Sequence, residues 1–190
     1  MENTYDKLIK AATEIMEFEG YAGTSIGHVA SKVGISKSTV IHYFKSKEGM
    51  LLAILENFLP DQINSFKPVL NDDSISGIVK LDKFIKCHMK MVAERRDVLS
   101  INLRDTKYLS GNNRVIYQQQ QRVYEGQVVE IVKQIQKESS VFSGLDSVIC
   151  AKAIIGMCNY ACIWFREGGE YSIDDIAEQM FALLVGSKLH

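Results

Sequence analysis

Proline is scarce in this chain and is confined to one short zone. Two of the 190 residues are prolines, Pro60 and Pro68. Proline interrupts a helix interior because it lacks the backbone N–H and its ring clashes with the preceding turn. The long stretches on either side carry apolar residues at three- and four-residue spacing, which is typical of amphipathic helices. We therefore predict an all-α fold of about nine helices, and the 46% apolar composition is sufficient for a substantial core.

The most informative pattern lies at residues 24–47. Thr24 and Ser25 are residue types that cap a helix, and the apolar positions behind them recur until Gly34, which ends a first short helix. Ser36 can cap a second short helix directly afterwards. Two short helices joined by a glycine turn form the helix-turn-helix pattern, in which the second helix enters the major groove of DNA.

In the second of these helices, Val40 and Phe44 are expected to face inward, which leaves the polar residues free to point outward. Contacts to phosphates fix the register of such a helix, whereas contacts to base edges choose the sequence. A stabilising surface role is the alternative for His42. The predicted DNA-binding residues are Thr24, Ser25, Tyr43 and Lys47 toward phosphates, and Lys37, Ser38, Thr39 and His42 toward base edges.

The same stretch resembles the N-terminal domain of TetR-family repressors. The family pattern runs as a threonine-serine cap, glycine-x-serine-lysine, x-tyrosine-phenylalanine and serine-lysine-glutamate. One position departs from it, because Ile41 stands where the family commonly carries a tyrosine that can touch the DNA backbone. The resemblance implies a repressor that binds a palindromic operator in double-stranded DNA. The matching residues are Gly34, Ser36, Lys37, Thr39, Tyr43, Phe44, Ser46, Lys47 and Glu48.

Three segments are predicted along the chain. Residues 1–47 form the helix-turn-helix domain, which includes an amphipathic helix at 5–19. Residues 48–64 form a connecting helix, and residues 75–190 form a helical ligand-binding and dimerisation domain. The stretch 66–77 is rich in proline, aspartate, serine and glycine, which is typical of a loop between domains.

The end of the chain is unusually apolar. Residues 146–167 are apolar around much of a helical circumference, and Ser172 with Asp175 predicts a capped final helix. A helix-turn-helix protein gains affinity by binding two half-sites as a twofold dimer. The last two helices are therefore the candidate homodimer interface, and the resemblance implies that they form a four-helix bundle. Burial within a single chain is the alternative for their apolar stripes.

The helical body before them is the expected sensor, because its aromatic and charged residues suit an apolar cavity with a polar mouth. Each can equally be a packing residue. The segments LRDTKYLS from Leu103 and AIIGMCNYACIWFREGG from Ala153 resemble TetR-like repressors that control fatty-acid or sterol breakdown and release DNA when a CoA thioester binds. This resemblance implies a small hydrophobic inducer such as a long-chain acyl-CoA, without another cofactor. The predicted ligand-binding residues are Arg104, Tyr108, Tyr124, Asn159, Tyr160, Trp164, Phe165 and Arg166.

Positive charge is concentrated on the predicted DNA-binding region, although the whole chain carries a net charge of −1. Residues 21–50 hold four lysines against one glutamate, a net of +3, so the remainder carries −4. No apolar run approaches the ~18 to 20 residues that cross a bilayer, and no apolar secretory region is present. The four cysteines form no CxxC pair, which suits a reducing compartment. A cytoplasmic protein without membrane contact is expected.

Other function classes fit the sequence less well. A serine elbow, a Walker loop and a glycine-rich dinucleotide motif are absent, so an enzyme is not expected. Cys158 and Cys162 lie at helical spacing, but structural zinc normally needs four ligands, so no metal site is expected. A multidrug-sensing repressor of an efflux gene and a helical protein-interaction module remain as alternatives.

Overall fold

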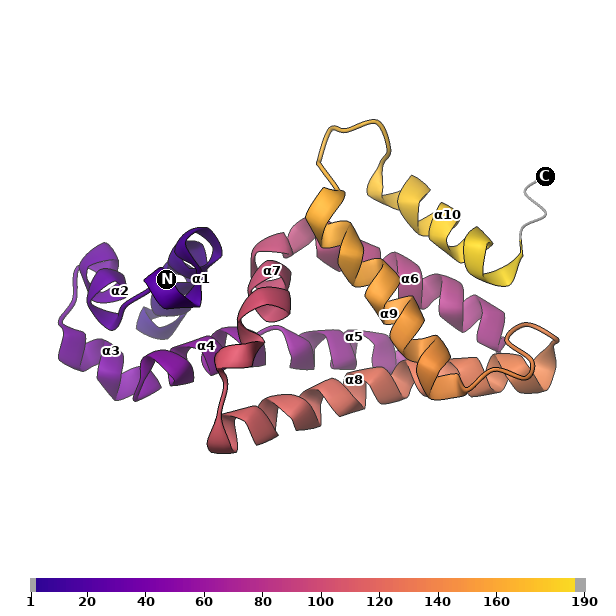
Figure 1. Ribbon diagram of the computed structural model, residues 1–190, viewed down its shortest axis with the longest axis horizontal. Coiled ribbons are helices and arrows are strands. Elements are labelled where there is room, and N and C mark those ends of the chain that lie inside the picture. The colour runs from indigo at the N-terminus through magenta and orange to yellow at the C-terminus, as the bar shows by residue number, and fades with distance from the viewer. Residues whose placement is uncertain (1–2, 187–190) are drawn as a thin grey trace. The chain divides into compact units, whose positions relative to one another are not determined.

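The computed structural model of the chain describes residues 3–186, which form helices without a strand (Figure 1). This confirms the predicted all-α fold, with ten α-helices and one short 3-10 helix in the described range. The outermost residues of the first and last predicted domains, 1–2 and 187–190, lie outside that range. The helices are α1 (Thr4–Gly23), α2 (Ile26–Val33), α3 (Lys37–Phe44), α4 (Lys47–Glu56), α5 (Leu59–Leu70), α6 (Gly77–Glu94), α7 (Arg96–Asp105), η1 (Thr106–Tyr108), α8 (Gly111–Glu138), α9 (Ser147–Trp164) and α10 (Ile173–Val185).

The helices group into two compact units. The first unit comprises Met1–Asp61 and Asp97–Gln120, and the second comprises Gln62–Arg96 and Gln121–His190. This grouping differs from the predicted division into three consecutive segments, because most of α7, all of η1 and the start of α8 join the helix-turn-helix. The reason is tertiary, since the Arg104 side chain on α7 donates to an α1 carbonyl and the Asn113 side chain on α8 donates to Glu48 on α4. The predicted domain limits themselves remain a prediction.

Side-chain caps begin the short helices of the first unit. The Ser25 hydroxyl accepts the His28 N–H at 3.0 Å, and the Ser36 hydroxyl accepts the Thr39 N–H at 3.1 Å. Gly34 ends α2 with φ of 75°, a left-handed conformation that glycine adopts without strain. The predicted cap at Ser36 and the glycine turn are confirmed, and Ser25 is the residue that caps α2.

The expected loop at 66–77 is partly helical, so that prediction is wrong at its start. Helix α5 continues to Leu70 with Pro68 inside it. Pro68 lies exposed in the last turns, where water can satisfy the carbonyl that loses its helical donor. Burial of Phe66 against Phe84, with ring centroids 5.4 Å apart, favours this extra helix. The sequence underestimated the helix because proline and aspartate near its end are loop-forming residue types.

Helix α6 is central to the second unit and packs against α9 and α10. At the start of α10, Ser172 and Asp175 exchange hydrogen bonds in a capping box, as predicted. Helix α9 ends at Trp164, earlier than the predicted 167, because Phe165 is extended and the Arg166 side chain donates to the carbonyl of Ile163 at 3.0 Å. The buried apolar face of α6 consists of Leu81, Phe84, Ile85, Met89, Met91 and Val92.

Helix α9 also corrects the prediction that no segment is apolar enough to cross a membrane. Ser147–Trp164 meets the length and composition criteria, with a mean hydropathy of 1.5 over 18 residues, and 39% of this segment is buried. The sequence prediction considered uninterrupted apolar runs, which Lys152 and Asn159 break, whereas the mean tolerates both. A single helix of this kind is also what the core of a soluble helical protein contains.

Candidate DNA interface and effector site

Helix α3 has an exposed polar face and a small buried apolar face. Val40 and Phe44 are buried, whereas Lys37, Ser38 and His42 are exposed. This confirms the predicted inward and outward sides of the helix. Two apolar or aromatic side chains on α3 are also exposed, namely Ile41 and Tyr43.

The hydroxyl groups at the start of α3 are tied together. Ser36 Oγ lies 2.7 Å from Ser38 Oγ and 2.8 Å from Thr39 Oγ1. Ser38 is exposed and Thr39 is half-buried. Both hydroxyls are therefore held in fixed positions at the end of the helix that a helix-turn-helix directs toward base edges.

Thr24, predicted to contact phosphate, forms its hydrogen bonds within the first unit. Its side chain is buried, its hydroxyl donates to the Gly20 carbonyl at 2.8 Å, and its N–H donates to the same carbonyl at 3.1 Å. Both of its donors are therefore used inside the first unit, and the phosphate contact of Thr24 stays a prediction. The neighbouring Ser25 remains exposed.

Lys47 lies half-buried at the start of α4. Its ammonium donates to the Ala22 carbonyl at 3.1 Å and lies 4.4 Å from the centroid of the Tyr21 ring. Tyr21 in turn stacks on Tyr108, with ring centroids 4.6 Å apart. The cation is thus held by a carbonyl and a ring face, which fixes its position. Tyr108, predicted to bind the effector, packs instead within the first unit.

Arg104 was also expected to bind the effector, but its guanidinium group binds two backbone carbonyls of α1 just before Gly20, which is non-helical. It donates to the carbonyls of Met16 at 2.6 Å and Glu17 at 3.2 Å, and it pairs with Asp105 at 2.8 Å. The hydrogen-bonded Asp105 carboxylate raises the pKa of Arg104. Asp105 is buried and also accepts the Tyr21 N–H at 3.3 Å. We call Arg104 and Asp105 the α7 clamp.

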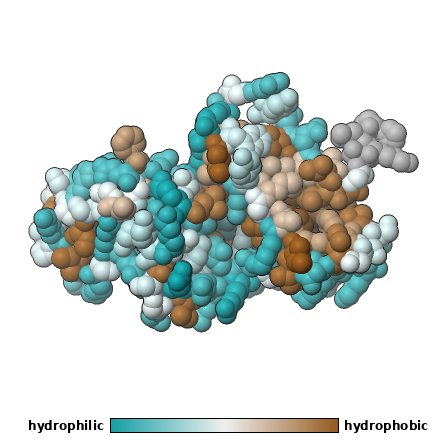
Figure 2. Space-filling model, in the orientation of Figure 1, coloured by the Kyte–Doolittle hydropathy of each residue, from teal (hydrophilic) through white to brown (hydrophobic). Residues whose placement is uncertain are grey.

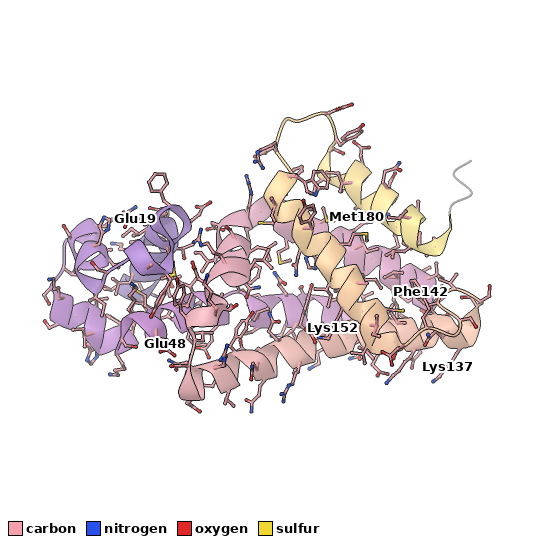
Figure 3. The ribbon with its side chains drawn as sticks, viewed as in Figure 1. Glu19, Glu48, Lys137, Phe142, Lys152 and Met180 are labelled. Atoms are coloured by element: carbon pink, nitrogen blue, oxygen red, sulfur yellow. The ribbon has the colours of Figure 1, made fainter. Side chains whose placement is uncertain are left out.

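A second connection within the first unit involves Glu48, labelled in Figure 3. Its carboxylate accepts the Ser110 N–H at 2.8 Å and the Asn113 side-chain amide at 3.0 Å. The hydrogen bond from the Ser110 backbone lowers the pKa of Glu48. Sequence reasoning missed the roles of Asp105 and Glu48, because their partners lie 84 and 62 residues away in the chain.

In the second unit, two predicted ligand-binding residues meet a histidine that was not predicted. His88 Nδ1 lies 2.6 Å from the Tyr124 hydroxyl, and Nε2 lies 3.1 Å from Asn159 Oδ1. With that amide orientation, Nε2 carries the proton and the Tyr124 hydroxyl donates to Nδ1. Desolvation by burial lowers the pKa of His88 to about 4 and raises that of Tyr124 well above its usual value. The clue missed in the sequence was a histidine on the apolar face of α6.

The other predicted ligand residues are divided between core and surface. Phe165 is buried, whereas Tyr160, Trp164 and Arg166 are exposed. Trp164 lines an apolar groove of about 430 Å³ beside α10. Apolar side chains also gather over α9 and α10 on the face shown in Figure 2. The remaining groove residues are Tyr171, Asp175, Ile176, Gln179, Met180 and Leu183.

Helices α1 to α3, with the exposed polar face of α3, form a helix-turn-helix domain, and further helices follow it in the chain. This organisation is that of a helix-turn-helix transcription regulator. Residues 8–54 match the family model for bacterial regulatory proteins of the tetR family, and residues 75–187 match the tetracyclin repressor-like C-terminal domain. The chain therefore belongs to the TetR family and is a transcriptional repressor of the TetR type. This confirms the predicted family and the prediction that the protein is a regulator and not an enzyme.

Several known proteins align along nearly the whole chain. The transcriptional repressor KstR2 of Rhodococcus jostii is 21% identical over 180 residues, which cover 94% of this chain and 88% of KstR2. The fold is similar to that of FadR from Bacillus subtilis in complex with stearoyl-CoA, with a TM-score of 0.81, 19% identity, and 96% and 98% of the two chains covered. It is also similar to AibR in complex with isovaleryl coenzyme A and operator DNA, with a TM-score of 0.83, 20% identity, and 96% and 98% coverage.

Proposed function

We propose that this repressor binds a palindromic operator as a homodimer in the cytoplasm and is released by a CoA thioester of a hydrophobic acid. The observation that carries the DNA-binding part is the rigid polar face of α3. Ser36 fixes the hydroxyls of Ser38 and Thr39, and Lys37 and His42 lie exposed beside them. Such a face can pair with base edges while the helix end and neighbouring cations contact phosphates.

The proposed dimer interface consists of α9 and α10. Ile149, Ile163 and Leu183 are 69%, 59% and 78% exposed, an unusual amount of apolar surface for two neighbouring helices of a soluble protein. A second copy would cover this surface and the apolar groove beside α10. We expect Leu183→Glu to shift the protein toward monomer in light scattering and to weaken operator binding. The exposed, isolated Phe18 on α1 provides a matched control, since Phe18→Glu should leave the dimer intact.

The proposed effector follows from the second unit and from the relatives. FadR and AibR are described with acyl-CoA molecules. The second unit buries His88 and Tyr124 beside Phe84, with ring centroids of 5.8 Å from Phe84 to each. The pKa shifts of His88 and Tyr124 are caused mainly by burial, and no carboxylate contributes to either shift. A cationic inducer would lack a counter-charge in that core.

Release requires the effector to favour a conformation that binds the operator less well. We propose that α8 and the α7 clamp transmit this preference. Helix α8 belongs to both units, since residues 111–120 group with the first and residues 121–138 with the second. The clamp and Glu48 attach α7 and the start of α8 to the helices that carry α3.

The test is a gel shift on DNA from the promoter region next to the protein's own gene. We expect a shifted complex that long-chain acyl-CoA dissociates and that a cationic dye such as ethidium leaves intact at concentrations below those at which it perturbs DNA. Release by the cationic compound alone would refute the proposed effector. Failure to select any DNA from a randomised duplex pool would refute operator binding itself.

A further inference from the structure

Five hydrogen-bonding side chains of the second unit are buried or half-buried, and we call them the interior polar cluster. They are Gln62, His88, Tyr124, Gln127 and Asn159, supplied by α5, α6, α8 and α9. Buried polar groups reduce stability relative to an apolar core unless they are fully hydrogen-bonded. Their presence in one core therefore points to a role other than packing.

Two atoms of the interior polar cluster have no hydrogen-bond partner among the described residues. Gln127 is 6% exposed, and its amide nitrogen donates to the Ile63 carbonyl at 3.0 Å, which fixes the orientation of the amide. This leaves Gln127 Oε1 buried and unpaired, and Gln62 Nε2 is buried and unpaired as well. The core thus holds one open acceptor and one open donor, which a bound molecule could satisfy.

The interior polar cluster is also uncharged at neutral pH. Burial lowers the pKa of His88 to about 4, and the neighbouring Cys158 thiol has its pKa raised to about 12, so both are neutral. No lysine, arginine, aspartate or glutamate contributes to the pKa shifts of His88, Cys158 or Tyr124. An ionised ligand group would have no counter-charge there, whereas a neutral carbonyl needs only a donor.

We propose that the interior polar cluster binds the carbonyl oxygen of the effector's thioester, with Gln62 as the hydrogen-bond donor, and rejects the ionised carboxylate of the corresponding free acid. The proposal rests on the proposed function and specifies which atom of the effector is recognised. The unpaired Gln127 Oε1 could accept a hydrogen bond from the same effector, because CoA thioesters carry amide N–H groups. Tyr124 lies three residues before Gln127 on α8, and its hydroxyl, His88 and Asn159 are fixed by hydrogen bonds to one another.

The test compares three probes on the full-length protein by isothermal titration calorimetry. Dodecanoyl-CoA carries the carbonyl, S-dodecyl-CoA replaces it with a methylene group, and dodecanoate carries an ionised carboxylate. We expect the thioester to bind roughly tenfold more tightly than the thioether, the value of one hydrogen bond to a buried group, and dodecanoate to bind much more weakly. The variant Gln62→Met should abolish the difference between thioester and thioether.

Gln62→Met removes a donor that has no partner in the structure, so the variant should fold with a melting temperature close to that of the unmodified protein. Gln134→Met is the matched control, because Gln134 lies on α8 with its amide bonded to the Ile75 carbonyl at 3.2 Å. It should retain the tenfold preference. Equal binding of thioester and thioether, an undiminished preference in Gln62→Met, or tight binding of dodecanoate would each overturn the proposal. If neither CoA compound binds, the proposed effector class fails and the carbonyl site fails with it.

Discussion

Replacing Gly49 with alanine tests how α3 is fixed to the rest of the first unit. Between α3 and α4, Lys45 has φ of 65°, and the Ser46 N–H donates to the Phe44 carbonyl at 2.7 Å, which forms a γ-turn. Ser46 then caps α4 by accepting the Gly49 N–H at 2.9 Å. This turn brings the Phe44 carbonyl so close that a Cβ at Gly49 would lie 2.0 Å from its oxygen.

The expected cost of Gly49→Ala follows from that distance. Non-bonded heavy atoms rest about 3.5 Å apart, so relief requires a displacement of more than roughly 1 Å. The obstructing Phe44 oxygen belongs to the backbone and cannot change rotamer, so we expect the upper part of the range of about 1–3 kcal/mol for overpacking. Alanine regains about 0.5–1 kcal/mol of helix propensity. The net loss in the free energy of unfolding should be about 2 kcal/mol, from these two estimates.

Urea unfolding followed by circular dichroism measures this loss, and a DNA-binding assay measures its consequence for α3. Gly126→Ala is the control, because Gly126 lies inside α8 and a Cβ there would meet no atom within 4 Å. The control should be more stable than the unmodified protein by about 0.5–1 kcal/mol. If Gly49→Ala proves as stable as the control, the γ-turn does not constrain the junction and the reasoning fails.

Three further perturbations test other parts of the molecule. Burial lowers the pKa of His88 from 6.5 to about 4, so between these pH values the unfolded state binds a proton at His88 that the folded state does not. Lowering the pH through this window should therefore reduce the free energy of unfolding by about 3 kcal/mol. Urea titrations should show that this part of the loss disappears in His88→Gln, and an unchanged pH profile would contradict it. Arg104→Met should leave the buried Asp105 carboxylate without its cation, although the Tyr21 N–H still donates to it, and lower stability by about 3 kcal/mol; an unaltered melting temperature would show that the α7 clamp contributes nothing. Lys47→Ala should weaken binding to all DNA sequences and reduce the salt slope by about one, and an unchanged slope would show that its bonds to the first unit are its whole role.

The sequence by itself determined the helical fold and the recognition element. Scarce proline, three- and four-residue apolar spacing, the cap at Ser36 and the glycine turn at Gly34 act over a few residues, so their outcome is visible in the chain. Local rules failed where a distant contact outweighed them. Pro68 lies inside α5 because burial of Phe66 favours helix there.

Only the tertiary structure decided which side chains act together. Arg104 was predicted to bind the effector from its place in a resembling segment, yet α7 brings it to the carbonyls of Met16 and Glu17. Thr24 is a capping residue type, yet folding buries its hydroxyl against Gly20. The interior polar cluster takes its residues from four helices, and its members lie up to 97 positions apart in the chain, Gln62 to Asn159. Such meetings depend on helix packing and desolvation, which no local spacing encodes.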